Sequence, residues 1–223
     1  MKAFVSWSGG KDAALSCYRA MRDKDIDVTH LLNMVSEDGK HSRTHGVSSE
    51  MLRIQAGAMS LPIVQKRTSW GNYEEGFKKT VAILKEDGIE AGVFGDIDLQ
   101  QHRDWVERVC AETGIRPIFP LWQAEREALL TEFIDLGFEA FVVSVKADVM
   151  GPEWIGRKID KMYIKELKGL DKVDLCGEAG EYHTLVVSGP IFKQKIDILK
   201  SKKINRDKHW FLDILDHEID EEN

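Results

Sequence analysis

The stretch Ala3-Phe-Val-Ser-Trp-Ser-Gly-Gly-Lys-Asp12 is the most informative part of this chain for its fold. Residues 3–7 form a short apolar run with a β-branched centre, which is typical of a buried strand. The pair Gly9-Gly10 ends this run, and apolar residues then recur at the spacing of an amphipathic helix, at Ala14, Cys17, Tyr18 and Met21. The stretch therefore predicts a strand, a tight loop and a helix in immediate succession.

Strands and helices continue to alternate in the first half of the chain. Further strands are expected at residues 28–35, 63–64 and 91–94, and a helical repeat of apolar residues follows each of them. This alternation is typical of βαβ units and predicts an α/β domain with a doubly wound parallel sheet. Ligands of such sheets bind beyond the carboxyl ends of the strands, which here are followed by residues 8–12, 36–49 and 95–104.

The second half has a more mixed pattern and predicts a smaller α+β domain. The expected elements are helices at residues 129–136 and 154–167 and a strand at residues 140–145. After Gly180 the apolar pattern has a period of two, and residues 196–198 and 210–214 repeat it around a charged turn, as in a hairpin. The acidic end from Asp213 to Asn223 is expected to fray. We therefore divide the chain into two domains, residues 1–121 and 122–223.

Composition restricts the partners and the compartment. The 223 residues include 31 basic and 38 acidic side chains, and a net charge of −7 does not favour nucleic acid as a partner. Three cysteines without a Cys-x-x-Cys pair, and the absence of a long apolar run, predict a cytoplasmic protein that does not enter a membrane. The oligomeric state stays open, a homodimer included. Five basic residues form a run, which we expect at a solvated hairpin tip: Lys200, Lys202, Lys203, Arg206 and Lys208.

The loop Ser8-Gly9-Gly10-Lys11-Asp12 has the properties of an anion cradle. Two glycines allow a phosphate to approach the backbone closely, and the N–H groups at the start of the helix hold negative charge. Lys11 adds a positive charge and Ser8 a hydroxyl. The spacing excludes a Walker A loop, because Val5 stands where its first glycine would be and Asp12 where its Ser or Thr would be. The alternative, an ordinary tight turn, is disfavoured by the strand before and the helix after.

The run Ser8-Gly9-Gly10-Lys11-Asp12-Ala13 resembles the signature of the N-type ATP pyrophosphatases, the PP-loop enzymes, whose fold is adenine nucleotide alpha hydrolase-like. The run Cys176-Gly177-Glu178-Ala179-Gly180-Glu181-Tyr182-His183-Thr184-Leu185-Val186 is similar to the diphthine–ammonia ligase group of that superfamily. Shorter similarities to the group are Gln55-Ala56-Gly57-Ala58, Pro120-Leu121-Trp122 and Trp154-Ile155-Gly156-Arg157. Ala13 replaces the usual final serine, so one phosphate hydroxyl is missing. The segment Gly95-Asp96-Ile97-Asp98-Leu99 and the residue His183 also depart from the ligases themselves and indicate a sister branch.

The resemblance implies a site for ATP with Mg²⁺. The residues that it implies for ATP binding are Ser6, Trp7, Ser8, Gly9, Gly10, Lys11, Asp12, Met34, Gly95 and Asp96, with Met34 beside the adenine. Asp96 and Asp98 follow a buried strand at its carboxyl end, where a carboxylate can position the Mg²⁺ of the nucleotide. Capping of the next helix by Asp98 is the structural alternative.

A second group of polar residues lies in the glycine-bent segment 177–183. Glu178, Glu181 and His183 are candidates to orient an amine nucleophile or take its proton, so we predict that they are catalytic together with Lys11. If a strand begins there, Glu181 and His183 share one face. An exposed acidic turn is the alternative. We further predict that Gly177, Gly180 and His45 contact the substrate; His41 and Arg43 lie in the same polar loop as His45.

The reaction that the resemblance implies is ATP-dependent amide formation. A carboxylate substrate attacks the α-phosphate, pyrophosphate leaves the acyl-adenylate, and ammonia (as ammonium in solution) displaces AMP. The implied substrate is diphthine, a modified histidine on translation elongation factor 2. Two alternatives stay open. One is a sulfur-transfer or tRNA-modifying enzyme on the same ATP scaffold, which would depend on Cys110 or Cys176; the other is a nucleotide-binding sensor without chemistry, suggested by Ala13.

Overall fold

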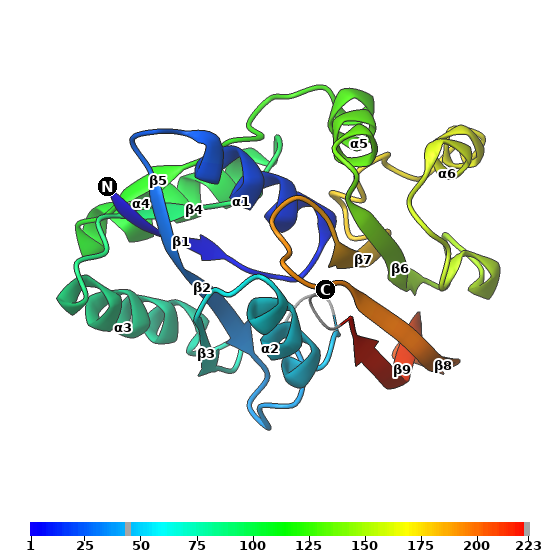
Figure 1. The fold of residues 1–223 in the computed structure, drawn as a ribbon, viewed down its shortest axis with the longest axis horizontal. Helices are drawn as coiled ribbons and strands as arrows, with labels where there is room; N and C mark the ends of the chain where they lie inside the picture. Colours follow the sequence, from blue (N-terminus) through cyan, green and yellow to red (C-terminus); the bar gives the residue numbers. More distant parts are fainter. Residues whose placement is uncertain (43–45, 221–223) are drawn as a thin grey trace.

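The computed structural model describes residues 1–42 and 46–220, and their strands form two sheets that lie in different halves of the molecule (Figure 1). The first sheet is parallel, with five strands in the order β3-β2-β1-β4-β5. Its strands are β1 (Lys2–Ser6), β2 (Asp27–Val35), β3 (Ile63–Arg67), β4 (Ala91–Val93) and β5 (Arg116–Ile118). The chain reverses direction across the sheet between β1 and β4, which is the switch point where doubly wound folds bind ligands. The predicted doubly wound sheet is confirmed.

Helices cover both faces of this sheet because the strand residues alternate in direction. The helices are α1 (Lys11–Arg22), α2 (Ser49–Ala58), α3 (Tyr73–Glu86) and α4 (Gln100–Thr113). Ala3 and Val5 of β1 pack in the cluster that includes the buried faces of α1 and α2. Phe4, between them, packs instead with α3 and α4, where its ring lies 6.1 Å from that of Phe77. Each face of the sheet therefore has its own layer of helices.

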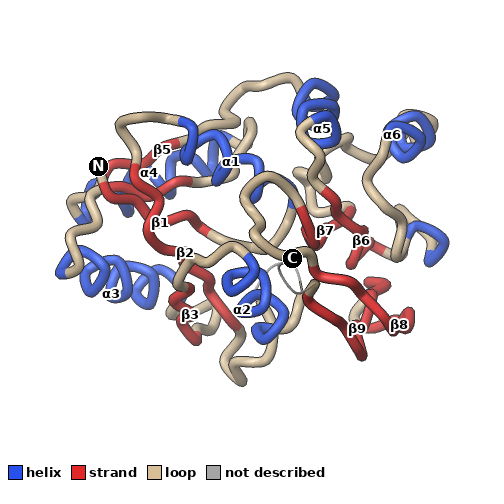
Figure 2. The backbone as a smooth tube through the Cα atoms, viewed as in Figure 1, coloured by secondary structure: helices blue, strands red, loops and turns tan. Residues whose placement is uncertain are grey.

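The second sheet is antiparallel, with four strands in the order β7-β6-β9-β8 (Figure 2). Its strands are β6 (Glu139–Lys146), β7 (Tyr182–Ser188), β8 (Ile196–Arg206) and β9 (His209–Ile219). The helical elements of this half are α5 (Arg126–Asp135), the short 3-10 helix η1 (Pro152–Trp154) and α6 (Lys161–Leu167). This sheet with its helices agrees with the predicted smaller α+β part.

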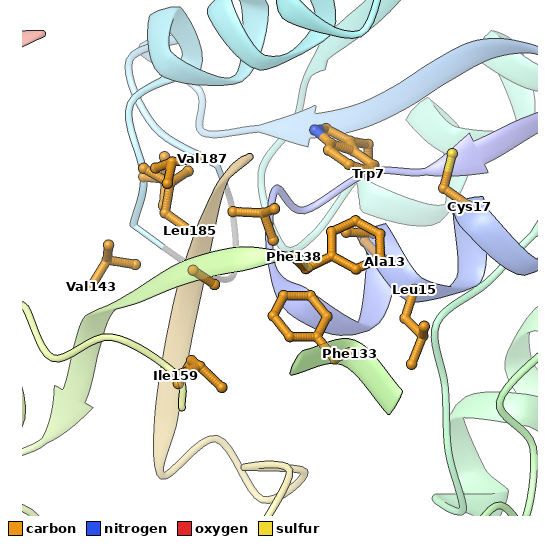
Figure 3. Close-up of a cluster of buried hydrophobic side chains, with 14 of the residues drawn as sticks. Trp7, Ala13, Leu15, Cys17, Phe133, Phe138, Val143, Ile159, Leu185 and Val187 are labelled. Atoms are coloured by element: carbon orange, nitrogen blue, oxygen red, sulfur yellow. The ribbon is translucent and has the colours of Figure 1, made fainter. Parts of the chain in front are cut away.

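The two halves share one hydrophobic cluster. Figure 3 shows Phe133 and Phe138 facing the α1 residues Ala13 and Leu15, and the two phenylalanine rings stack 4.8 Å apart. Leu185 of β7 belongs to the same cluster. Because this cluster crosses from one sheet to the other, α1 and the glycine loop before it are fixed by packing from both halves. The division at residues 121 and 122 stays a prediction.

Two of the expected elements of the second half are wrong. A single helix over 154–167 does not form, because Ile155 is extended and Gly156 has a φ of +81°, which end η1. A new helix, α6, begins only after Asp160, whose side chain caps it by accepting from the Tyr163 N–H. The acidic end is not frayed from Asp213 either, since β9 pairs with β8 as far as Ile219.

The basic run also differs from its expected place. Lys200, Lys202, Lys203 and Arg206 lie along the strand β8, and only Lys208 lies in the turn that joins β8 to β9. The register puts Lys202 opposite Asp213, and their charged groups are 3.3 Å apart. Acidic side chains of β9 therefore face part of the basic run.

Candidate active site

The glycine loop between β1 and α1 is held in place by backbone and amide groups of distant segments. Gly9 has a φ of +82°, and its carbonyl oxygen accepts from the Gln55 side chain at 3.0 Å and from the Val186 N–H at 2.9 Å. The Lys11 N–H donates to the Thr184 hydroxyl at 3.0 Å. At least one amide of the expected anion cradle is thus satisfied by the protein itself.

Replacing Gly9 with alanine should separate steric fit from backbone strain. The new Cβ would lie 2.4 Å from Leu52 Cδ2 and 2.6 Å from Gln55 Oε1, and φ is in the left-handed region. We expect a loss of about 2–3 kcal/mol in the free energy of unfolding, together with weaker ATP binding. The control is Gly137→Ala, where φ is +83° but a Cβ meets nothing within 4 Å. Equal shifts of the melting temperature in the two variants would show that the contacts around Gly9 do not matter.

The ammonium group of Lys11 is buried and bound by three protein groups. Its Nζ donates to the Cys176 carbonyl at 2.5 Å and to Asp12 at 2.8 Å, and it lies 5.1 Å from the centre of the Tyr182 ring. Burial acts to lower the pKa of Lys11, but the neighbouring Asp12, Cys176 and Glu178 outweigh it, and the pKa is raised above its ordinary value. Lys11 therefore stays charged and joins the glycine loop to the segment that begins at Cys176.

That segment, the acidic loop (residues 174–181), is shaped by its own hydrogen bonds. The Asp174 carboxylate accepts from the N–H groups of Cys176 at 2.8 Å and Glu178 at 3.2 Å. Arg126 pairs with Asp174 at 2.9 Å and with Asp98 at 2.6 Å, so it joins the acidic loop to the loop after β4. Asp98 thus binds Arg126 and does not cap α4, whose N-cap residue Leu99 makes no side-chain cap bond.

A cavity of about 680 Å³ lies where these loops meet, at the switch point of the sheet. It brings together most of the polar residues that the sequence singled out. The predicted residues that line it are Ser6, Ser8, Lys11, Asp12, Gly95, Asp96, Gly177, Glu178, Gly180 and His183. Residues far apart in the chain therefore form one site, from the carboxyl ends of β1 and β4 and from the acidic loop.

Other predicted site residues do not line this cavity. Trp7 is buried and donates from Nε1 to Gln55 at 3.1 Å, and Met34 lies in the core cluster between the sheet, α3 and α4. Glu181 is buried and accepts from the Asp174 N–H at 3.1 Å, so its side chain braces the acidic loop. Gly9 and Gly10 shape the loop without lining the cavity. His45, like Arg43, falls outside the described residues.

The cavity is also lined by residues that the sequence did not predict to bind ATP or substrate, although Ala13 and Cys176 among them were already of interest for other reasons. They are Ala13, Trp70, Leu99, His102, Cys176, Ala179, Tyr182 and Thr184. Trp70 is 71% exposed and stacks on Tyr73, with ring centres 6.2 Å apart. It follows β3 by three residues, so its place at a carboxyl strand end was the signal that could have identified it.

The electrostatics of the cavity favour one proton-accepting carboxylate. Burial raises the pKa of Glu178 to about 7, and the carboxylates of Asp12 and Asp96 act in the same direction. Burial also lowers the pKa of His183 to about 4, so its imidazole is neutral at pH 7. Groups with such shifted pKa values, together in a cleft, are typical of catalytic sites.

The donor set of the cavity suits a hard cation only in part. Among residues 1–42 and 46–220, no group of three or more His, Cys, Asp or Glu side chains is arranged to hold a metal ion. Asp96 lines the cavity, and its partner is His102 at 3.3 Å. Mg²⁺ in nucleotide enzymes commonly uses one or two carboxylates with substrate phosphates and water, so a single carboxylate such as Asp96 is sufficient on the protein side.

A glycine loop with a buried lysine at the switch point of a parallel sheet defines the class of protein, a doubly wound α/β protein with a cleft suited to a phosphate-bearing ligand. Two family models match in succession, the diphthamide synthase N-terminal domain over residues 1–117 and the diphthamide synthase C-terminal domain over residues 125–220. The chain belongs to the diphthamide synthase family. This membership confirms the predicted resemblance and the predicted type of enzyme, an ATP-dependent amide-forming ligase that uses ATP and ammonia.

The curated relatives carry the name diphthine–ammonia ligase. The rat protein is 28% identical over 92% of this chain and 85% of its own length, and the human protein is 29% identical with the same coverage. The fission yeast relative is 29% identical, but the chain spans only 37% of its length. A solved structure from Methanocaldococcus jannaschii, titled as a predicted subunit of tRNA methyltransferase, is similar at 16% identity, 85% coverage of this chain and 98% of its own, and a TM-score of 0.45.

No helix in the part of the chain that the structure describes is both long enough and apolar enough to cross a bilayer.

Proposed function

We propose that this protein activates the carboxylate of diphthine on elongation factor 2 with ATP and joins it to ammonia. The observation that carries the proposal is the meeting of the glycine loop and the acidic loop at one cavity of about 680 Å³. Membership of the diphthamide synthase family and the names of the relatives support the choice of substrate. A cytoplasmic location and a homodimer stay predictions.

The reaction has two steps that balance. A carboxylate oxygen attacks the α-phosphorus, the bridging bond from the α-phosphorus to the β-phosphate oxygen breaks, and pyrophosphate leaves with the electron pair. Ammonia then attacks the acyl carbon, the acyl–oxygen bond of the adenylate breaks, AMP leaves, and the nitrogen loses one proton. The first step creates negative charge on the departing pyrophosphate. Fixed positive charge and N–H dipoles near that position lower the barrier.

In this proposal the glycine loop and the amino end of α1 face the β- and γ-phosphates. The charge of Lys11, fixed by its bonds to Asp12 and the Cys176 carbonyl, lies beside the leaving group. Mg²⁺, when bound with the nucleotide, would be held by Asp96 and would neutralise phosphate charge. Trp70 offers an exposed aromatic face at the same cavity and replaces Met34 as our candidate for contact with the adenine.

Glu178 is our candidate for the base that takes the proton from the attacking nitrogen. With a pKa of about 7, its carboxylate is protonated below pH 7 and accepts a proton above it. We expect the rate of amide formation, at constant free ammonia, to rise with pH through about 7 in the wild type. Glu178→Gln should lose roughly 10²-fold in rate and lose that pH dependence. An unchanged pH profile in the variant would assign the proton transfer to another group.

The same substitution should stabilise the fold above neutral pH. The pKa of Glu178 is raised in the folded state, so the folded state holds the proton that the unfolded state releases. The contribution of Glu178 to the free energy of unfolding therefore falls as the pH rises from the ordinary pKa of glutamate to about 7. We therefore expect Glu178→Gln to melt at a higher temperature than the wild type at pH 8 and at a similar temperature at pH 4, measured by differential scanning calorimetry.

The proposed activity is tested by identifying which nucleotides form from ATP. The purified protein is incubated with ATP, Mg²⁺, ammonium and elongation factor 2 that carries diphthine, and the nucleotides are separated. Release of AMP and pyrophosphate, dependent on both ammonium and diphthine, is the expected result. Release of ADP and phosphate, or AMP formation that does not depend on diphthine, contradicts the proposal.

The sulfur-transfer alternative receives no support from the cysteines. Cys110 and Cys176 are buried, and burial raises the pKa of each thiol to about 12, so neither is a ready thiolate nucleophile. Full activity after replacement of both cysteines would exclude that alternative. The sensor alternative predicts tight ATP binding without AMP from any substrate.

A further inference from the structure

A second cavity, of about 560 Å³, lies next to the first and is not used by the mechanism above. Three parts of the chain supply its lining: the loop after β2, the paired strands β6 and β7, and the end of β8 with the start of β9. The described residues that line it are Ser36, Glu37, Asp38, His41, Ser42, Gly46, Ser144, His183, Arg206, His209 and Phe211. These segments are distant in sequence, so the cavity is formed by the tertiary structure alone.

His183 lines both cavities and therefore marks where they adjoin. The first cavity is also lined by Lys11, Glu178 and Thr184. A molecule that fills the second cavity as far as His183 brings its end to the polar residues that surround the nucleotide site. A two-substrate enzyme needs this arrangement, because the atom that attacks and the phosphorus that is attacked must meet.

The second cavity has a buried floor and a charged rim. Two hydroxyl residues form part of the floor: Ser42 is 3% exposed and Ser144 is 1% exposed. On one wall the rings of His209 and Phe211 lie 5.9 Å apart, and the guanidinium group of Arg206 lies 5.3 Å from the Phe211 ring. Glu37 and Asp38, from the loop after β2, are exposed and also line the cavity. The lining thus offers two exposed carboxylates for a cation, together with one guanidinium group that lies against an aromatic ring.

We propose that this second cavity receives the acyl substrate, as a carboxylate-bearing side chain that projects from a protein. This inference rests on the proposed function and names the place of its second substrate. The carboxylate end lies at His183, and a positively charged part of the substrate or of its carrier protein lies against Glu37 and Asp38. Buried hydroxyls on the floor match a polar end group, while the exposed rim leaves room for the carrier.

The charges of the rim favour a protein carrier over an RNA. A nucleic acid brings one negative charge per phosphate, and Glu37 and Asp38 would repel it at the mouth of the cavity. Lys202 faces Asp213 across the hairpin, which reduces the positive field of the basic run near this rim. Opposite charges across an interface mainly raise the association rate and the selectivity for the right partner.

The test removes the rim charges and leaves the nucleotide site unchanged. The variant Glu37→Gln/Asp38→Asn keeps the shapes of both side chains. It also keeps a side-chain oxygen at position 38 that can accept from the Lys40 N–H. The matched control is Glu86→Gln/Asp87→Asn, a second exposed Glu-Asp pair, at the end of α3 and outside both cavities. For each protein we measure the KM for diphthine-bearing elongation factor 2, the kcat for AMP release, and the Kd of a non-hydrolysable ATP analogue by calorimetry.

We expect the KM of the rim variant to rise about tenfold at low salt, with kcat and the Kd of the ATP analogue within about twofold of the wild type. The rise should shrink at high salt because the exposed charges are then screened, and the control pair should behave as the wild type. If the wild type releases AMP and the rim variant keeps its KM, the acyl site lies elsewhere and only this inference is overturned. If the wild type releases no AMP, the proposed function fails and the assignment of this occupant fails with it. A KM that falls in the rim variant would indicate an anionic partner such as RNA and would also overturn it.

Discussion

Lys11→Ala is expected to reduce AMP formation by roughly 10²–10³-fold, the loss that follows removal of one preorganised group that stabilises charge in a transition state. The Lys11 side chain is 4% exposed, and its ammonium group is bound to Asp12 and to the Cys176 carbonyl, so its position is fixed before the nucleotide arrives. In the proposed mechanism, its loss removes the positive charge beside the leaving pyrophosphate. It also leaves the Asp12 carboxylate without its cation at the cavity wall.

The control for this variant is Lys146→Ala. Lys146 also binds the acidic loop, through a hydrogen bond from its Nζ to the Ala179 carbonyl at 2.5 Å, but it does not line the nucleotide cavity. We expect it to lose less than about tenfold in rate, since it removes a brace and no charge at the phosphates. The measurement is single-turnover release of AMP from labelled ATP. If the rate of AMP release falls by the same factor in both variants, Lys11 acts by bracing the loop. If Lys11→Ala keeps the wild-type rate, the assigned role of Lys11 is wrong.

Gln55→Leu is expected to cost roughly 3–5 kcal/mol in the free energy of unfolding. The Gln55 side chain is fully buried; it accepts from Trp7 Nε1 at 3.1 Å and donates to the carbonyls of Gly9 at 3.0 Å and Val186 at 2.6 Å. A leucine of similar size leaves these buried groups without that partner, and each such group costs about 1–3 kcal/mol. The melting temperature should fall by roughly 10 °C in a chain of this size.

The same substitution should weaken ATP binding, because Gln55 holds the carbonyl of Gly9 in the glycine loop. Gln100→Leu is the matched control, since Gln100 is exposed on α4 and makes one side-chain bond, to Asp104 at 2.7 Å. Its expected change is within about 0.5 kcal/mol. Thermal unfolding with and without a non-hydrolysable ATP analogue measures both effects. A melting temperature within about 2 °C of the wild type for Gln55→Leu would show that the three hydrogen bonds of Gln55 contribute little to stability.

Local patterns predicted the first half of the fold well for a physical reason. A β-strand alternates the directions of neighbouring side chains, and a glycine pair after an apolar run ends it, so β1, the glycine loop and α1 follow from adjacent residues. The same patterns cannot show on which side of a sheet a given residue lies when both faces are covered. Met34 is the example: we expected it beside a nucleotide, and it packs with α3 and α4 instead.

Errors in the second half arose where single backbone angles override a periodic pattern. Apolar residues from Trp154 to Leu167 have helical spacing, but Gly156 adopts a positive φ and separates η1 from α6. Glu181 and His183 were expected on one face of a strand, but their side chains do not lie together. β7 begins only at Tyr182, so Glu181 turns back to the Asp174 N–H while His183 faces the cavities.

Local sequence specifies the parallel α/β sheet, the glycine loop at its switch point and the acidic loop, because each depends on neighbouring residues and their spacing. How these parts act together depends on contacts between distant segments. These contacts pair Lys11 with the carbonyl of Cys176, place Trp70 at the first cavity, and form a second cavity that His183 shares with the first. Such contacts join residues that are far apart in the chain, and no local pattern encodes the packing of two sheets around one hydrophobic cluster.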